Sequence, residues 1–585
     1  MQRLTKPFIN ICVADFSGGM EISMNNEEYI LYLNSLHNYN AQNQNAYGEK
    51  NVISPFFNDV VVKVGLCDFI VEQLNCSNPH IIILTGHAGD GKTSIMYQVL
   101  KDLGIGFDTN EEIIDVHLPN KKVCRCIKDF SELTDEKKLE VLEEIVDFPG
   151  QNKFVFMVAN TGPLINTYGE LFDSAEEKEK ARIALIAAMD ENTASINNIM
   201  DHKISVINVA TVDNTYFASE FLNNLIQEKL WVGCDSCKKK VYCHIIRNRN
   251  IVIENIQRVT DFINMHYIWL TEHGKRLTIR SMTEQLAYML TGGENCQEIA
   301  EKEGYKYLFS NLFFGYIGTK SNAKASNIIA VREASNCNYD LKRLRSDEQL
   351  LVNHDYDFLF GKNVADILKE AEKKNAYVEG WTEYLRRTYM FLNIITDEKI
   401  KANDSEDIFS KQFLRYLELR NGESIPSKSD ARLIIDALSM IYIGTTKSEK
   451  EIPLSLSRES GITQNVQLIT GTIPTRRLSI VQEKTKYRLF NKNKSRNVLK
   501  LKIDSQVLDC ELSLPLLDYF EELKNGAIAT NVDPQLTHGV ESLKAQLSKV
   551  MDDEDDNTIE MIILKNNGNK TIRLELTDSK MIRCI

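Results

Sequence analysis

Short apolar runs alternate with longer helical stretches between residues 81 and 209. Runs that are apolar on both faces are typical of parallel strands covered by helices on each side. Their alternation with helices predicts a doubly wound α/β layer. The five runs cover residues 81–84, 113–116, 123–127, 154–159 and 204–209.

The pattern changes twice after this layer. From about residue 215 to 450 it is mostly helical, with amphipathic stretches at 283–290 and 364–372 and almost no proline. From about residue 452 short strand-like runs return around one helical stretch, 514–524, which predicts a smaller β-rich domain. These runs cover residues 454–456, 466–470, 478–481, 487–490, 499–503, 560–564 and 571–576.

Composition narrows the classes of function. The 585 residues are 43% hydrophobic and 26% charged, which is enough apolar material for several cores. The formal net charge of −13 excludes a globally basic nucleic-acid coat, so any contact with DNA needs a local basic patch. No run approaches the roughly 18 to 20 apolar residues of a membrane helix, and the N-terminus is a poor secretory signal. We therefore expect a cytoplasmic protein.

The first apolar run leads directly into a glycine-rich loop. Residues 86–93 match G-x-x-x-x-G-K-[ST], and a helix-compatible run follows. Glycines let successive backbone amides point at one anion, and the N-terminus of the helix also favours negative charge. Lys92 would reach the β- and γ-phosphates of ATP, and the Thr93 hydroxyl would hold Mg²⁺. The expected nucleotide-binding residues are Gly86, His87, Ala88, Gly89, Asp90, Gly91, Lys92, Thr93 and Ser94. The alternative is a glycine-rich turn that binds nothing.

Such a loop works with an acidic residue at the end of a neighbouring strand, which organises Mg²⁺ and water. Asp129, at the end of VCRCIKD, is the predicted magnesium ligand, and Glu132 would polarise the attacking water. Two basic residues interrupt this run, so Asp115 remains an alternative. Asp129 is equally suited to cap a turn or helix, with Ser131 sharing that role.

Two further segments supply candidate phosphate contacts. The run FVFMVAN ends at Asn160, which would sense the γ-phosphate as in AAA-type ATPases; ordinary turn chemistry is the alternative. Downstream, Arg276 and Arg280 lie at the start of a predicted helix that Thr278 would cap. Arg280 is expected to reach the phosphates from this helical lid, whereas most exposed helix arginines are simply solvated.

A cysteine motif follows the α/β layer. Cys234 and Cys237 have the C-x-x-C spacing that lets two thiolates bind one tetrahedral ion, and Cys243 and His244 follow closely. Three thiolates with this imidazole, or with a distant fourth ligand, predict a structural Zn²⁺ site. The alternative is a loop of free thiols in a reducing compartment.

A basic stretch lies in the C-terminal region. Between residues 484 and 502 it holds eight basic residues: Lys484, Lys486, Arg488, Lys492, Lys494, Arg496, Lys500 and Lys502. It is the best candidate for a DNA-backbone surface, and an edge strand guarded by lysines is the alternative. Residues 342–345 and 386–387 form weaker patches, and the acidic run 552–556 predicts a solvated loop. No second active site is visible.

Several segments together resemble one family. GHAGDGKTS, KDFSEL, VANTGPLINTYGEL, CDSCKKKVYC and LTIRSMTEQLAYMLTGG, in this order over roughly residues 80–295, resemble the bacterial ATPases of the DptF type or a sister family. Those ATPases belong to phosphorothioation-dependent DNA restriction systems. The resemblance implies that Lys92 and Thr93 bind ATP and Mg²⁺, that the cysteines bind zinc, and that partner subunits join the protein in defence against foreign DNA.

These observations predict a P-loop NTPase of the AAA or STAND kind, with a parallel sheet core, a helical lid and domain, and a smaller C-terminal β-rich domain. The expected parts are an N-terminal extension at 1–75, the NTPase core at 76–225, a zinc-binding insertion at 226–250, the helical lid and domain at 251–450, and the C-terminal domain at 451–585. Two functions remain open besides the defence ATPase: a STAND-type signalling ATPase that forms homo-oligomers on binding ATP, and a small-molecule kinase.

Overall fold

A computed structural model describes most of the chain. The described residues are 26–37, 39, 51, 54–106, 111–191, 196–299, 304–375, 378–393, 401–444, 450–455, 466–484, 496–526, 533–551, 558–564, 570–576 and 582–584. The expected strand at 487–490, the acidic run 552–556 and residues 1–25, 38, 40–50 and 52–53 of the expected N-terminal extension lie outside these residues.

A six-stranded sheet with the order β2-β3-β4-β1-β6-β5 organises the N-terminal part. Its strands are β1 (Ile81–Gly86), β2 (Ile113–His117), β3 (Val123–Ile127), β4 (Phe154–Asn160), β5 (Asn197–Ile199) and β6 (His202–Asn208). The inner four strands run parallel, as expected, but β2 and β5 are antiparallel to their neighbours. The expectation of a purely parallel sheet is therefore wrong at both edges. Short turns cause this, because a hairpin can join only antiparallel strands.

Helices cover both faces of this sheet. Ile82 and Leu84 of β1 face α4 (Gly65–Asn75) and α5 (Lys92–Asp102), whereas Ile81 and Ile83 belong to a second core. That core is closed by α6 (Asp135–Ile145), α7 (Thr161–Glu170) and α8 (Ala175–Glu191). Every residue of β1 is buried because it lies between two strands and two helix layers. The expected α/β layer is confirmed.

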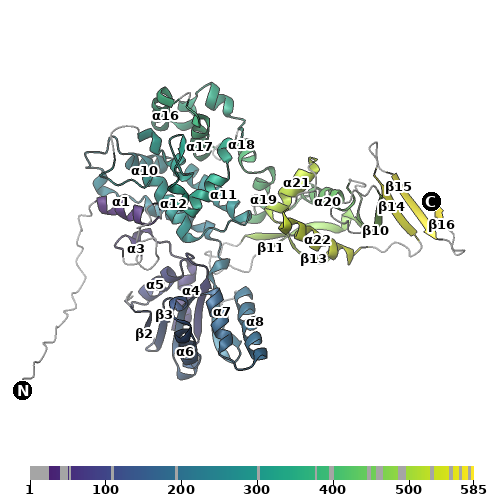
Figure 1. Ribbon diagram of the computed structural model, residues 1–585, viewed down its shortest axis with the longest axis horizontal. Coiled ribbons are helices and arrows are strands. Elements are labelled where there is room, and N and C mark those ends of the chain that lie inside the picture. The colour runs from purple at the N-terminus through teal and green to yellow at the C-terminus, as the bar shows by residue number, and fades with distance from the viewer. Residues whose placement is uncertain are drawn as a thin grey trace, which may run out of the picture.

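A helical body lies beside the α/β layer (Figure 1). Its larger helices are α1 (Asn26–Ser35), α9 (Ala218–Leu225), α10 (His244–Glu254), α11 (Ile256–Glu272), α12 (Ile279–Thr291), α14 (Ile329–Asn336), α16 (Lys362–Asn375) and α17 (Trp381–Asn393). Shorter pieces are α3 (Phe57–Val60), α13 (Phe309–Phe313), α15 (Tyr356–Phe360) and α18 (Lys401–Ile408). A two-residue hairpin, β7 (Tyr316–Ile317) and β8 (Lys320–Ser321), interrupts the predicted helical stretch. Tyr29 of α1 donates a hydrogen bond from its hydroxyl to the Leu225 carbonyl (2.7 Å), so part of the N-terminal extension belongs to this body.

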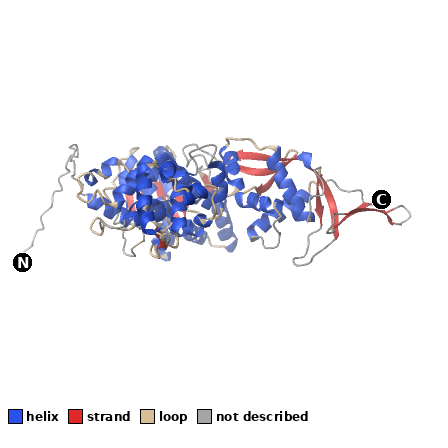
Figure 2. Ribbon diagram, turned by 90° about the horizontal axis from the view of Figure 1, so that it is seen from above, coloured by secondary structure: helices blue, strands red, loops and turns tan. Residues whose placement is uncertain are grey.

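The C-terminal part extends away from these two units and carries the remaining strands (Figures 1 and 2). One sheet has the order β16-β15-β14-β10-β9 and another the order β11-β12-β13. The strands are β9 (Glu451–Ser455), β10 (Val466–Pro474), β11 (Leu478–Lys484), β12 (Asn497–Ile503), β13 (Gln506–Glu511), β14 (Thr558–Ile563), β15 (Lys570–Leu576) and β16 (Ile582–Cys584). Helices α19 (Lys411–Asn421), α20 (Lys428–Ile443), α21 (Leu514–Lys524) and α22 (Pro534–Ser548) pack with them.

Most predicted elements are confirmed, including the helix at 514–524. The short strands β5, β7, β8, β13 and β16 carry too few apolar residues to have been recognised from pattern alone. Among the described helices, none is long and apolar enough to cross a lipid bilayer.

Candidate functional site

The glycine-rich loop connects the central strand β1 to α5. Three of its glycines have positive φ: Gly86 at 148°, Gly89 at 87° and Gly91 at 82°. Residues with a side chain rarely adopt such angles, so the loop needs glycine at these positions to adopt this backbone conformation. The loop ends at the N-terminus of α5, where unpaired backbone amides and the helix dipole favour an anion.

Lys92 is held across the mouth of this loop. Its Nζ donates hydrogen bonds to the carbonyls of Gly86 (3.2 Å) and His87 (2.7 Å) and to Oδ1 of Asn160 (3.0 Å). Burial lowers the pKa of Lys92, while Asp90 and Asp129 act in the opposite direction. Asn160 therefore lies next to the loop, as the sequence predicted, because β4 is the parallel neighbour of β1.

Asp90 braces the loop from within. Its side chain is fully buried, accepts a hydrogen bond from the His87 amide (2.8 Å) through Oδ2, and pairs through Oδ1 with Arg276 (2.9 Å). Burying a carboxylate is unfavourable unless it is paired and hydrogen-bonded, and both partners are present here. Arg276, one of the two arginines near the start of the predicted lid helix, therefore contacts the loop through Asp90.

The start of α12 rests on the same loop. Thr278 caps this helix by accepting from the Ser281 amide (3.2 Å), and its Oγ1 lies 3.1 Å from where a Cβ on Gly89 would be. The Arg280 amide donates to the Gly89 carbonyl (3.4 Å). The predicted lid helix therefore begins beside the glycine-rich loop, with Arg280 in its first turn.

The segment after β3 also reaches this end of the sheet. Asp129 caps a 3-10 turn, Phe130–Glu132, by accepting from the Ser131 amide (2.9 Å), and it lies near enough to act electrostatically on Lys92. Ser131 in turn accepts from the Asn160 amide (2.7 Å). Asp129 thus has the expected capping role beside the loop, and the exposed Glu132 ends the same turn.

Asp115 lies elsewhere. It sits on the edge strand β2, which β3 and β4 separate from β1, and forms a bidentate pair with Arg125 (2.7 and 2.9 Å). A hydrogen bond from Arg125 lowers the pKa of Asp115. The geometry therefore favours Asp129 over Asp115 as the acidic residue of the site.

The cysteine motif is arranged differently from the sequence expectation. His244 is buried at the start of α10, where its Nε2 lies 3.1 Å from the Thr291 carbonyl and its ring stacks on Tyr307. Cys234, Cys237 and Cys243 instead share their surroundings with Cys296. In the described part of the chain, no three His, Cys, Asp or Glu side chains converge as ligands on one point.

The basic stretch at 484–502 is only partly a surface. Arg496 is 8% exposed and pairs with Asp213 of the α/β layer, and Lys500 pairs with Glu483 (3.2 Å). Strand β12, which carries Lys500 and Lys502, is the middle strand of its sheet, so the edge-strand alternative is wrong there. Lys486, Arg488, Lys492 and Lys494 lie outside the described residues.

The weaker basic patch at 386–387 is engaged within the fold. Arg387 is buried against Asp340, with its guanidinium 3.8 Å from the centre of the Tyr316 ring, and Arg386 pairs with Asp347. Arg387 cannot form part of a DNA-binding surface because it is 1% exposed.

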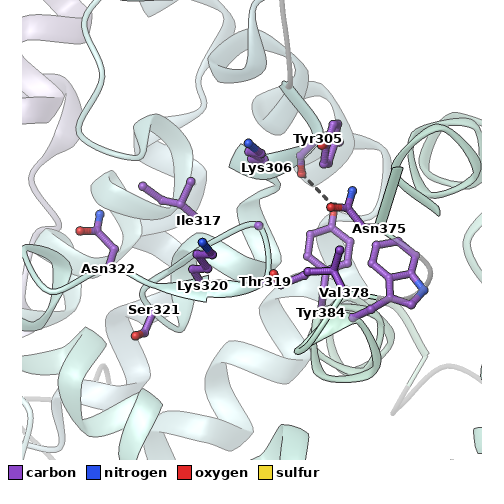
Figure 3. Close-up of a pocket in the computed structure, with 12 residues that line it drawn as sticks. Tyr305, Lys306, Ile317, Thr319, Lys320, Ser321, Asn322, Asn375, Val378 and Tyr384 are labelled. Carbon is purple, nitrogen blue, oxygen red and sulfur yellow. Dashed lines mark hydrogen bonds between the residues drawn. The ribbon is translucent and has the colours of Figure 1, made fainter. Parts of the chain in front are cut away.

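A cavity of about 400 Å³ lies in the helical body, outside the phosphate-loop site (Figure 3). The stacked rings of Trp381 and Tyr384, with centroids 5.1 Å apart, form one wall, and the β7–β8 hairpin forms another. The Tyr384 hydroxyl donates to the Tyr305 carbonyl (2.8 Å), which fixes this wall in place.

Comparisons of the chain with models of protein families, with curated proteins and with solved structures found no match. The function of this chain is therefore inferred from its own residues and their geometry. Sequence reasoning missed two partners, Asp90 with Arg276 and Cys296 with the C-x-x-C motif. Neither pair has a spacing signal, because 186 residues separate the first pair and different loops carry the cysteines.

Proposed function

We propose that this chain is a P-loop ATPase with its nucleotide site at residues 86–94. The observation that carries the proposal is the ammonium group of Lys92, held at the loop mouth by two backbone carbonyls and Asn160. An ammonium in this position can exchange neutral carbonyl oxygens for the more negative oxygens of the β- and γ-phosphates.

The parallel strands supply the remaining roles. Thr93 would hold Mg²⁺ together with Asp129, Glu132 would orient the attacking water, and Asn160 would contact the γ-phosphate. Asp129 and Asn160 follow the adjacent strands β3 and β4, whose carboxyl ends lie at the same edge as the loop. Arg280, in the first turn of α12, is the candidate for neutralising phosphate charge from the lid.

Calorimetric titration of the whole chain with ATP and Mg²⁺ tests this proposal. We expect binding by the wild type and affinity about tenfold to a hundredfold lower in Lys92→Ala, because a charge-assisted hydrogen bond is lost. Lys101→Ala, an exposed lysine at the end of the same helix, should bind like the wild type. A folded wild type that takes up neither ATP nor GTP would refute the assignment.

The wider role in bacterial defence rests on the sequence resemblance alone. On that reading ATP turnover is coupled to DNA engagement or to partner subunits, and stimulation of turnover by DNA is the supporting result. The alternative is a STAND-type switch that forms homo-oligomers on binding ATP. One contact favours it: Arg496 joins the C-terminal part to Asp213, shortly after β6. An unchanged molecular mass with and without ATP would exclude this switch.

A further inference from the structure

The C-x-x-C motif is left unexplained by the proposed ATPase function. Cys234 and Cys237 lie on a tight turn in which the Cys237 amide donates to the Cys234 carbonyl (3.3 Å). Cys243 follows at the N-cap of α10, with its amide bonded to the Lys239 carbonyl (2.9 Å). The three thiols therefore come from one compact loop, whose outer side is exposed at Cys237.

A fourth thiol reaches this loop from a distant segment. Cys296 lies in a turn beyond the C-terminus of α12, and the Lys239 ammonium donates to its carbonyl (2.7 Å). The other side of that turn is tied to α1, where Asn34 Nδ2 donates to the Glu294 carbonyl (2.9 Å) and to Asn295 Oδ1 (2.9 Å). The position of Cys296 is thus set by contacts from both flanking segments.

All four thiols interact with one another. Cys234 is influenced electrostatically by Cys243, Cys296 and Cys237, and each of the three remaining pairs among these residues also interacts. Burial raises the pKa of Cys243, while the backbone amides of Ile246 and Ile245, at the start of α10, hydrogen-bond its sulfur and act in the opposite direction. Amides directed at a sulfur stabilise a thiolate, which is the form that binds metal.

His244 does not fit the role of fourth ligand. It is 4% exposed, lies in the first turn of α10 and is engaged with the Thr291 carbonyl. Moving its ring toward the thiols would break the contact with that carbonyl and the stacking on Tyr307.

We propose that Cys296, and not His244, joins Cys234, Cys237 and Cys243 to form a four-thiolate structural Zn²⁺ site. Tetrahedral binding draws the four sulfurs to about 2.3 Å from one ion. Each thiol that binds releases a proton, and no redox step is involved. Lys239, Arg247 and Arg249, which already interact with these thiols, offset the net negative charge of a four-thiolate zinc centre.

Such a site has a structural consequence for the lid helix. Helix α12 begins on the phosphate loop at Thr278 and ends just before the Cys296 turn. Zinc would therefore fasten the far end of this helix to the loop between α9 and α10. Zinc binding at this site does not require nucleotide binding, so the two proposals can be tested independently.

Metal analysis of the full-length protein tests the site. We expect about one zinc per wild-type chain, and a zinc affinity at least about a hundredfold lower in Cys296→Ser. Cys337→Ser is the matched control, because Cys337 is also a partly buried thiol but donates to the Glu333 carbonyl. His244→Gln should keep its zinc. A zinc-free wild type, a zinc-replete Cys296→Ser, or loss of zinc from folded His244→Gln would overturn the proposal.

A second measurement avoids variants that fail to fold. In the wild type, mass spectrometry after thiol alkylation should find Cys234, Cys237, Cys243 and Cys296 protected together and released together by a chelator. Alkylation of Cys296 at the same rate before and after chelation, or a disulfide joining two of the four, would contradict the assignment.

Discussion

The glycine-rich loop and the cysteine cluster are built in opposite ways. All nine residues assigned to the loop are contiguous, and their glycines alone permit the required backbone. The cysteine cluster needs a turn, a helix start and a third segment that α1 and Lys239 hold in place. A site that binds through main-chain amides can be encoded locally, whereas a site that binds through side-chain sulfurs depends on the packing of distant elements.

The loop nevertheless has a tertiary support at its buried residue Asp90, because Arg276, which pairs with this side chain, comes from the segment before the lid helix. Removing the contact between Asp90 and Arg276 tests whether the loop depends on tertiary structure. If the loop were purely local, removing the support would change little.

The largest effect is expected from Asp90→Ala. It leaves the His87 amide and the partly exposed Arg276 without their acceptor, and losing these hydrogen bonds destabilises by about 2 kcal/mol. Denaturant unfolding measures the loss, and ATP affinity should fall with it. Asp135→Ala is the control, since its paired side chain is 99% exposed and should contribute less than about 1 kcal/mol. Equal free energies of unfolding for the two variants would show that the contacts of Asp90 do not stabilise the loop.

A smaller effect is expected from Gly89→Ala. The change forces a side chain to φ of 87° and places its Cβ 3.1 Å from Thr278 Oγ1. The positive φ alone destabilises by about 1–2 kcal/mol. Gly104→Ala is the matched control for the positive φ alone. Gly104 has φ of 73°, and nothing lies within 4 Å of a Cβ added there.

The difference between these two glycine variants isolates the contact of the loop with the lid helix. We expect Gly89→Ala to lose more stability than Gly104→Ala in the same unfolding experiment, and only Gly89→Ala to weaken nucleotide binding. Identical losses would mean that α12 can move away from the loop without a penalty.

The smallest effect is the pH dependence of nucleotide affinity. Burial lowers the pKa of Lys92 below its usual 10.5, so the protein without nucleotide loses this proton at a lower pH than ordinary lysines do. ATP requires the protonated form, so affinity should fall as pH rises through that pKa, by at most about tenfold per pH unit. Calorimetry at alkaline pH, in two buffers of different ionisation enthalpy, should detect proton uptake on binding. In Lys92→Ala the slope should disappear.

Sequence and structure agree best where the periodicity was long and regular. Strands β1, β3, β4 and β6, and helix α21, lie where the apolar pattern predicted them. The antiparallel direction of β2 was missed because its residues are compatible with either direction, and β5 was not recognised because it is short and has few apolar residues. Asn160 was correctly associated with the loop, since the end of a parallel neighbour must reach the same edge. The fourth cysteine was not identified, because no spacing rule links residue 296 to residue 243.

By itself the sequence determined the loop, its lysine and the helix that follows it, because backbone conformation near glycine depends on neighbouring residues along the chain. Only the tertiary structure decided that Arg276 pairs with Asp90, that Arg496 is buried against Asp213 and that Cys296 faces the C-x-x-C turn. These contacts depend on which surfaces pack together and exclude water. A buried charge is unfavourable unless it is paired, so it is stable only where packing places a partner beside it.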